Sequence, residues 1–471
     1  MLRPRPLPRL RPLTCALAVL AGLMTGPLAA APTQGIELSA DQMRAAAWMA
    51  LRGGDPNQAL QFSQALIRRD PQDRAALLIH SRAARDLGQY DQAKQSARLA
   101  WRLSTDDGAK YASSLVMAQA LSSNGQRTQA QWWLRRAIQY APNDALSRKA
   151  VEDFRYVRLR NPWAAQLSFS VTPDSNINNG SSARYSFLNY QLSEIFFGGP
   201  AEYQLGGSSR ALSGVEYALG LNTRYRLAET ETQAHDIIFT ADLHHYTLSN
   251  EAKSIAPGAK GSDFDYASYS LGYSFRGLNW GGRGEYRLSG DLGQVWYGGE
   301  EYLRFYRLGS GQSYRLRSGD KIDLRLAGEH QDGIATSDSD ILRLDVSHTT
   351  RVLNGATLWT NATLARATSS YAADEFDEFG LRAALTLAKP LAGATVQLGL
   401  WARNRSYDFS PHSPDGRSDD RVQADFTMIF RQIDYYGFNP TMQISASRTY
   451  SNISLYDADR LGVNFGIQSA F

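Results

Sequence analysis

The side chains best suited to chemistry are two adjacent histidines, His244 and His245, which follow Asp242. Neighbouring side chains of a β-strand point to opposite faces, so the two histidines cannot share a metal ion, whereas Asp242 and His244 lie on one face. One such pair is more often a structural hydrogen bond than a catalytic site. The sequence contains no cysteine-based metal spacing, no H-E-x-x-H motif and no phosphate-binding loop. We therefore expect a protein that is not an enzyme and that binds no cofactor.

A run of carboxylates is the second candidate for chemistry. It consists of Asp374, Glu375, Asp377 and Glu378. Closely spaced carboxylates can hold a divalent cation, and in the outer loop of an outer-membrane protein that cation would lie near lipopolysaccharide. The alternative is a run that is simply solvated. Both interpretations place the run in an exposed loop.

The most distinctive polar segment combines Asp, Ser and Asn within six residues. These side chains hydrogen-bond to neighbouring backbone groups and therefore favour turns. The segment consists of Pro173, Asp174, Ser175, Asn176, Ile177 and Asn178. Two interpretations are open: an ordered turn, or a functional element at the point where a barrel begins.

From residue 163 to the C-terminus, apolar residues recur at every second position, which predicts β-strands. The opposite faces carry polar or charged residues such as Asp323, Arg325, Arg382 and Gln397. Apolar outward and polar inward is the pattern of a transmembrane barrel, although a soluble sandwich also alternates. We expect about fourteen antiparallel strands, an even number. They lie near 163–172, 212–227, 235–248, 264–277, 283–297, 301–315, 320–332, 338–350, 355–369, 376–389, 394–407, 419–431, 439–450 and 459–471.

The last of these strands ends on an aromatic residue. Phe465, Ile467 and Phe471 share its apolar face, and a terminal strand closed by Phe resembles the signal by which the barrel-assembly machinery recognises outer-membrane barrels. The alternative is the last strand of a soluble sheet. We expect this strand to close the barrel by pairing with residues 163–172.

The connections between the predicted strands are unequal in length. Every second one is short, whereas 172–211, 249–263 and 408–418 are longer and more polar, the asymmetry of periplasmic turns and outer loops. The N-terminal half and the short turns then share the periplasmic side. The segment 174–211 contains an apolar stretch, 185–197, and either plugs the barrel or folds over its rim.

Residues 35–160 predict a helical repeat. They are rich in good helix formers, and glycines recur at spacings of 34 and 37 residues. Tetratricopeptide repeats (TPRs) have a period of about 34, with glycine at the turn, alanine at the helix contact and proline after the second helix. The signature residues are Gly54, Ala59, Pro71, Gly88, Tyr90, Ala93, Gly125, Ala130 and Pro142. A short superhelix of this kind binds peptides or proteins; a non-repeating helical bundle is the alternative.

Residues 1–30 have the layout of a secretory signal peptide, with four arginines, an apolar stretch and small residues before the expected cleavage site. Cys15, the only cysteine, would leave with it. The formal net charge of +4 falls to zero without the four arginines. Since the chain also lacks a basic tail, we expect no nucleic-acid partner.

Taken together, two features of the chain resemble the surface lipoprotein assembly modulator family. They are the order of the domains 1–30, 35–160 and 163–471, and the run from Asp174 to Asn178. The resemblance implies an outer-membrane translocator that delivers lipoproteins or soluble effector proteins to the cell surface. It also implies that the repeats engage the client or a periplasmic chaperone. An exopolysaccharide export porin and a passive channel with a periplasmic tether are the alternatives.

Overall fold

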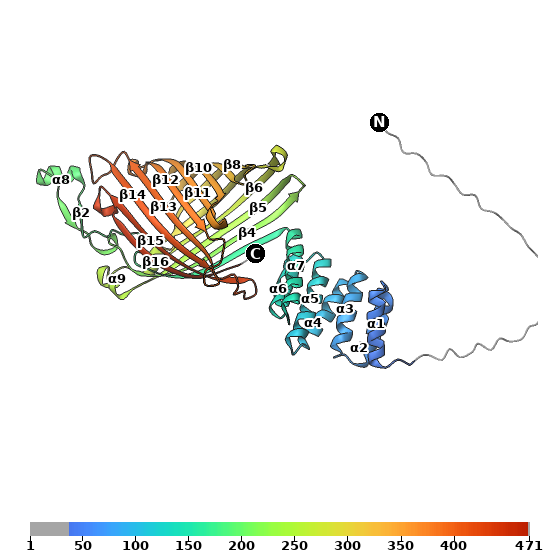
Figure 1. Ribbon diagram of the computed structural model, residues 1–471. Helices are drawn as coiled ribbons and strands as arrows, with labels where there is room; N and C mark the ends of the chain where they lie inside the picture. Colours follow the sequence, from blue (N-terminus) through green and yellow to red (C-terminus); the bar gives the residue numbers. More distant parts are fainter. Residues whose placement is uncertain (1–36, 470–471) are drawn as a thin grey trace, which may run out of the picture.

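The computed structural model describes residues 37–469 and consists of a helical stack followed by a β-barrel (Figure 1). The expected signal peptide, 1–30, and Phe471 lie outside the described residues. The change from helix to strand falls between Arg160 and Trp163. None of the helices within 37–469 is long and apolar enough to cross a membrane.

Seven helices form the stack, in pairs that pack in sequence order. Glycines with φ between 75° and 80° reverse the chain inside each pair. Residues with a Cβ atom rarely adopt this backbone conformation. Side-chain caps begin several helices; Asp55, for example, accepts from the backbone N–H of Gln58 at 3.0 Å. The helices are α1 (Ala40–Arg52), α2 (Pro56–Arg69), α3 (Arg74–Asp86), α4 (Tyr90–Arg102), α5 (Asp107–Ser123), α6 (Arg127–Gln139) and α7 (Asp144–Arg160).

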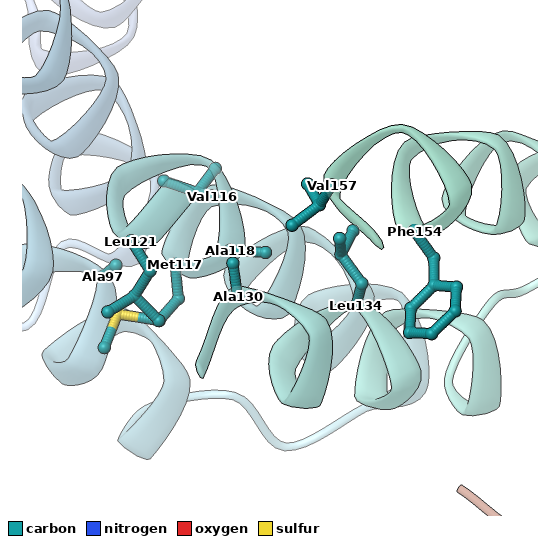
Figure 2. Packing of buried hydrophobic residues seen from close by; sticks show 9 residues of the cluster. All are labelled: Ala97, Val116, Met117, Ala118, Leu121, Ala130, Leu134, Phe154 and Val157. Carbon is teal, nitrogen blue, oxygen red and sulfur yellow. The ribbon is translucent and has the colours of Figure 1, made fainter. Parts of the chain in front are cut away.

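The largest helical core joins α4, α5, α6 and α7 (Figure 2). Small alanines such as Ala97 and Ala130 let the helices approach closely, and larger side chains fill the remaining space. Phe154 and Val157 of α7 belong to this core. The helix that leads into the barrel is therefore packed into the repeats rather than attached by a loose linker.

The barrel is closed and has fourteen antiparallel strands within 37–469, as the sequence predicted. Each strand pairs with its neighbours in sequence, and the last pairs with the first. The barrel strands are β1 (Trp163–Asp174), β4 (Gly214–Glu229), β5 (Gln233–Leu248), β6 (Tyr266–Asn279), β7 (Gly284–Tyr297), β8 (Glu300–Arg315), β9 (Lys321–Gly333), β10 (Ser339–Arg351), β11 (Thr357–Ser369), β12 (Phe376–Thr386), β13 (Thr395–Tyr407), β14 (Arg417–Ile429), β15 (Phe438–Ser451) and β16 (Ala458–Ser469).

The barrel wall has an apolar outer face and a polar inner face. Leu308, Leu400 and Phe465 are more than half exposed, a costly arrangement in water but the expected one against lipid. The inner face carries ion pairs that cross from strand to strand. The barrel therefore has the architecture of an outer-membrane protein.

The two ends of the barrel differ. At the near end, which adjoins the helical stack, the connections are turns such as 230–232 and 280–283. At the far end lie longer loops, 175–213 with β2 (Tyr185–Phe187), α8 (Tyr190–Phe197) and β3 (Glu202–Gln204), and 249–265 with α9 (Asn250–Ile255). The predicted asymmetry of the connections is present.

Candidate functional site

The lumen wall carries paired charges of both signs. Near the helical stack, Asp236 of β5 is only 2% exposed and accepts hydrogen bonds from Arg226 and, at 3.1 Å, from Arg276. Arg224 Nε lies 3.9 Å from the same carboxylate. Burying a carboxylate is costly unless it is paired, and the three arginines meet that requirement.

Similar groups recur around the wall. Arg307 of β8 lies 3.3 Å from Asp291 and 2.5 Å from Glu329. Farther round, Glu378 of β12 accepts from Arg405 Nη2 at 2.6 Å. A wall that alternates in sign does not form a filter for ions of one charge.

The prediction that the whole acidic run lies in an exposed loop is wrong. Asp377 and Glu378 lie within β12, where successive side chains point to opposite faces. Glu378 faces the lumen arginines, and Asp377 forms a bidentate pair with Arg366, with both distances 2.7 Å. Only Asp374 and Glu375 belong to the connection 370–375. The run therefore does not form one cation site.

The two histidines face opposite sides, as expected. His244 Nδ1 lies 2.7 Å from Glu216 Oε1 rather than bonding to Asp242, and His245 Nδ1 lies 2.9 Å from Asp265 Oδ2. Among residues 37–469 no three His, Cys, Asp or Glu side chains are grouped so that they could hold a metal ion. The histidines therefore act as hydrogen-bonding groups of the wall.

The join between β1 and β16, which we call the seam, is incomplete within the described residues. Against β4, β1 is paired along its whole length, Trp163–Asp174. Against β16, only Ser168–Val171 and Asp174 have partners. Leu167 N donates to the side-chain Oγ of Ser469. Within the described residues, the seam therefore has fewer backbone pairs than the join between β1 and β4.

Pro173 weakens the seam directly. The backbone N–H groups of Leu167 and Ser175 both point to β16, so residue 173, at the same parity, also directs its nitrogen there. Proline has no N–H to donate. The edge toward β4 is unaffected because Pro173 remains in register with Val215.

The polar turn, which comprises Pro173 to Asn178, spans the far end of this seam. Asp174 Oδ2 accepts from Arg460 Nε of β16 at 2.6 Å, and its Oδ1 accepts from Asn176 N at 2.8 Å. Ser175 N donates to Leu461 O, and Leu461 N donates back to Ser175 Oγ. At this point, side-chain hydrogen bonds therefore add to a backbone ladder that is interrupted.

The second half of the polar turn anchors the returning chain. Asn176 is almost fully buried and donates to Gly180 O and Asp459 O. Asn178 accepts from Leu212 N at 2.9 Å, and Ile177 packs against Leu212 and α9 residues. The segment is an ordered turn, and it contacts both β16 and the residues that lead into β4.

The apolar segment that follows lies over the rim of the barrel. β2 and α8 stand beyond the strand ends at the far end (Figure 1). Tyr190 N donates to Pro411 O, and Ser454 Oγ donates to Tyr185 O. These contacts place residues 185–204 on the loops 408–416 and 452–457, which favours the rim interpretation over a plug.

The predicted repeat residues occupy the turns and contacts of the helical stack. Gly54, Gly88 and Gly125 are the three positive-φ turns within the helix pairs. Ala59, Ala93 and Ala130 are fully buried at helix contacts. Three others lie at helix boundaries: Tyr90 begins α4, and Pro71 and Pro142 follow α2 and α6.

The helical stack is held at the barrel by the linker that leads into β1 and by a contact with the turn 430–437. Asn161, between α7 and β1, bonds to Thr128 of α6. In addition, Tyr140 Oη lies 3.0 Å from Tyr436 Oη in the turn 430–437, between β14 and β15. This hydrogen bond raises the pKa of Tyr436 to about 12. Two separate contacts therefore hold the stack at the near end of the barrel.

A cavity of about 1160 Å³, which we call the entrance cavity, lies where the end of α7 meets β1 and β4. Its walls combine residues of α6 and α7 with residues of β1 and β4. Six of the lining residues are arginines: Arg127, Arg155, Arg158, Arg160, Arg224 and Arg226.

Sequence reasoning missed the residues of this junction. Tyr140 and Tyr436 are 296 positions apart, and no local pattern connects them. The arginines of α7 resemble an ordinary solvated helix face. Their spacing at Arg155 and Arg158, about one turn apart, was the only available signal.

No protein-family model matches the chain, and no curated protein matches it. Solved structures resemble its two parts separately. The helical part is similar to the type III secretion translocator chaperone SycD of Yersinia enterocolitica, with 23% identity over 26% of this chain and 88% of that one, at a TM-score of 0.24.

The barrel part is similar to two solved outer-membrane proteins. One is described as a bacterial polysaccharide outer membrane secretin, with 9% identity over 65% of this chain and 98% of that one, at a TM-score of 0.32. The other is an outer membrane channel of Pseudomonas putida F1, with 9% identity, 64% and 95% coverage and a TM-score of 0.33. At these scores the function has to be argued from the geometry of the chain itself.

Proposed function

We propose that the protein is an outer-membrane translocator, not an enzyme, that delivers lipoproteins or soluble effector proteins to the cell surface. The observation that carries the proposal is the position of the helical stack. It is held at the near end of the barrel by the linker residue Asn161, which bonds to Thr128, and by the contact of Tyr140 with Tyr436. In this position the repeats would present whatever they bind at the lumen entrance, beside β1.

In this proposal the helical stack lies in the periplasm and engages the client or a periplasmic chaperone. TPR-like surfaces bind extended peptides, which suits an exported protein that has not yet folded. Phe465, Ile467 and Phe471 would direct assembly of the barrel by its assembly machinery. Loops at the far end would face lipopolysaccharide.

Polysaccharide export is less well supported by the lumen. A porin for a charged polysaccharide would favour a wall of one sign, whereas Arg307 and Arg405 alternate here with Asp291 and Glu378. A passive channel does not need a helical stack fixed at its entrance.

Deletion of the gene followed by surface proteomics of intact cells tests the proposal. We expect specific surface or secreted proteins to disappear and to return on complementation. Loss of a surface polysaccharide with an unchanged surface proteome would contradict protein translocation.

A further inference from the structure

The entrance cavity concentrates positive charge where the helical stack meets the lumen. Helices α6 and α7 together contain eight Lys and Arg residues but only three Asp and Glu residues. Two of those three carboxylates, Glu152 and Asp153, already lie within 3.9 Å of Lys149 Nζ. The arginines beyond them are therefore not neutralised by their own helix.

Three of the arginines are available to a ligand. Arg127, Arg155 and Arg158 form no ion pair within residues 37–469, and Arg155 and Arg158 are exposed. Glu229 is the one carboxylate among the lining residues, and it pairs with Arg226 at 2.5 Å. The cavity thus offers several guanidinium groups with unused donors, the arrangement that binds carboxylates in a bidentate manner.

The remaining lining residues favour a polypeptide over a sugar polymer. Among residues 37–469 no aromatic side chain lines the cavity, and sugar rings in transport pathways typically stack on aromatic rings. Gln166 and Asn222 contribute carboxamides on the lumen side, which can donate to and accept from a peptide backbone.

We propose that the entrance cavity binds an acidic segment of the polypeptide in transit, with its Asp or Glu carboxylates against Arg127, Arg155 and Arg158. The proposal rests on the proposed function, because it names the chemistry of the client that the translocator accepts. Positive charge at the entrance would also raise the rate at which acidic segments arrive.

Binding of a fluorescent deca-glutamate peptide to the full-length protein in detergent micelles tests the site. The variant Arg155→Gln/Arg158→Gln is expected to bind about tenfold more weakly and with a weaker salt dependence, because two charge-assisted contacts are lost. Both side chains are exposed, so the fold should be retained. The matched control is Arg68→Gln/Arg69→Gln, which removes the same charge from exposed positions of α2 away from the cavity.

Equal peptide affinity in the two variants would overturn the site. So would tight binding of oligogalacturonate together with no binding of the glutamate peptide, because the ligand would then be an acidic saccharide. The two proposals fail separately. An unchanged surface proteome after gene deletion, with cavity-dependent peptide binding intact, removes the translocator but leaves the binding site.

Discussion

Strand β1 has one edge built like the rest of the barrel and one edge that is not. Toward β4, twelve consecutive residues are in register. Toward β16, the described residues pair along the backbone only at Ser168–Val171, at Asp174 and through Ser175 N, and the intervening Pro173 lacks a donor. Side chains of the polar turn compensate through Arg460 and Leu461.

This difference indicates where the barrel wall can open. The join to β4 is a continuous ladder of backbone bonds, whereas among the described residues the seam combines a shorter ladder with side-chain contacts at its far end. Opening the seam would therefore disrupt fewer interactions than separating β1 from β4. We hypothesise that export requires this opening, and the predictions below compare the two edges, beginning with the largest effect.

A covalent lock across the seam should abolish export. Ser168 is in register with both Gln468 of β16 and Gly220 of β4, and antiparallel partners lie within disulfide range. Ser168→Cys/Gln468→Cys would lock the seam, because no other cysteine follows Cys15. We expect surface delivery of a client found by proteomics to stop under oxidation and to resume on reduction.

The control locks the other edge from the same residue. Ser168→Cys/Gly220→Cys should leave export intact, since that edge need not open. Normal export through the oxidised seam variant would favour a route through the closed lumen.

Breaking the buried pair of the polar turn should have the next largest effect. Asp174 is 6% exposed, and removing one partner of a buried pair costs about 3–5 kcal/mol. Asp174→Asn should therefore lower the temperature at which the barrel loses heat-modifiable migration on gels and should increase membrane leakage.

An exposed pair provides the comparison. Arg366 and Asp377 join β11 to β12 at the surface, where solvent screens an ion pair and leaves it little effect on stability. Arg366→Gln should leave the transition nearly unchanged. Equal losses in both variants would contradict a special role for the polar turn.

The sequence predicted more of the fold than of the site. Alternation with a period of two identified all the barrel strands, because each strand records its two environments locally. The polar turn was recognisable as a turn, but its partner Arg460 lies 286 residues away and no local rule selects it. The acidic run was misplaced because Glu378 continues the lumen face of β12, and its arginines come from other strands. Contacts between distant residues are set by barrel closure, which a single pattern does not encode.

Restoring the missing donor should strengthen the seam modestly. Pro173→Val would supply an N–H toward β16 and suits a strand. A backbone hydrogen bond contributes about 1 kcal/mol, so the heat-modifiability transition should rise by a few degrees and export should slow. An unchanged transition would indicate that β16 offers no acceptor at this position.

The smallest effect is expected at the tyrosine contact between the helical stack and the barrel. Tyr436→Phe removes the hydrogen bond to Tyr140, a loss of about 1 kcal/mol. The folded-state pKa of Tyr436, about 12, exceeds its ordinary value near 10. The contact is therefore fully present below about pH 10 and is lost as the pH rises toward 12.

Energy transfer between labels at Arg68→Cys in α2 and Ser318→Cys in the turn 316–320 measures this contact. In the otherwise unchanged protein, the distance distribution should broaden between pH 10 and 12. In Tyr436→Phe it should already be broader at pH 8 and should lose that response, and Tyr140→Phe should behave alike. If both variants match the parent at every pH, the tyrosine pair does not hold the stack, and the contact of Asn161 with Thr128 alone must position it beside the seam.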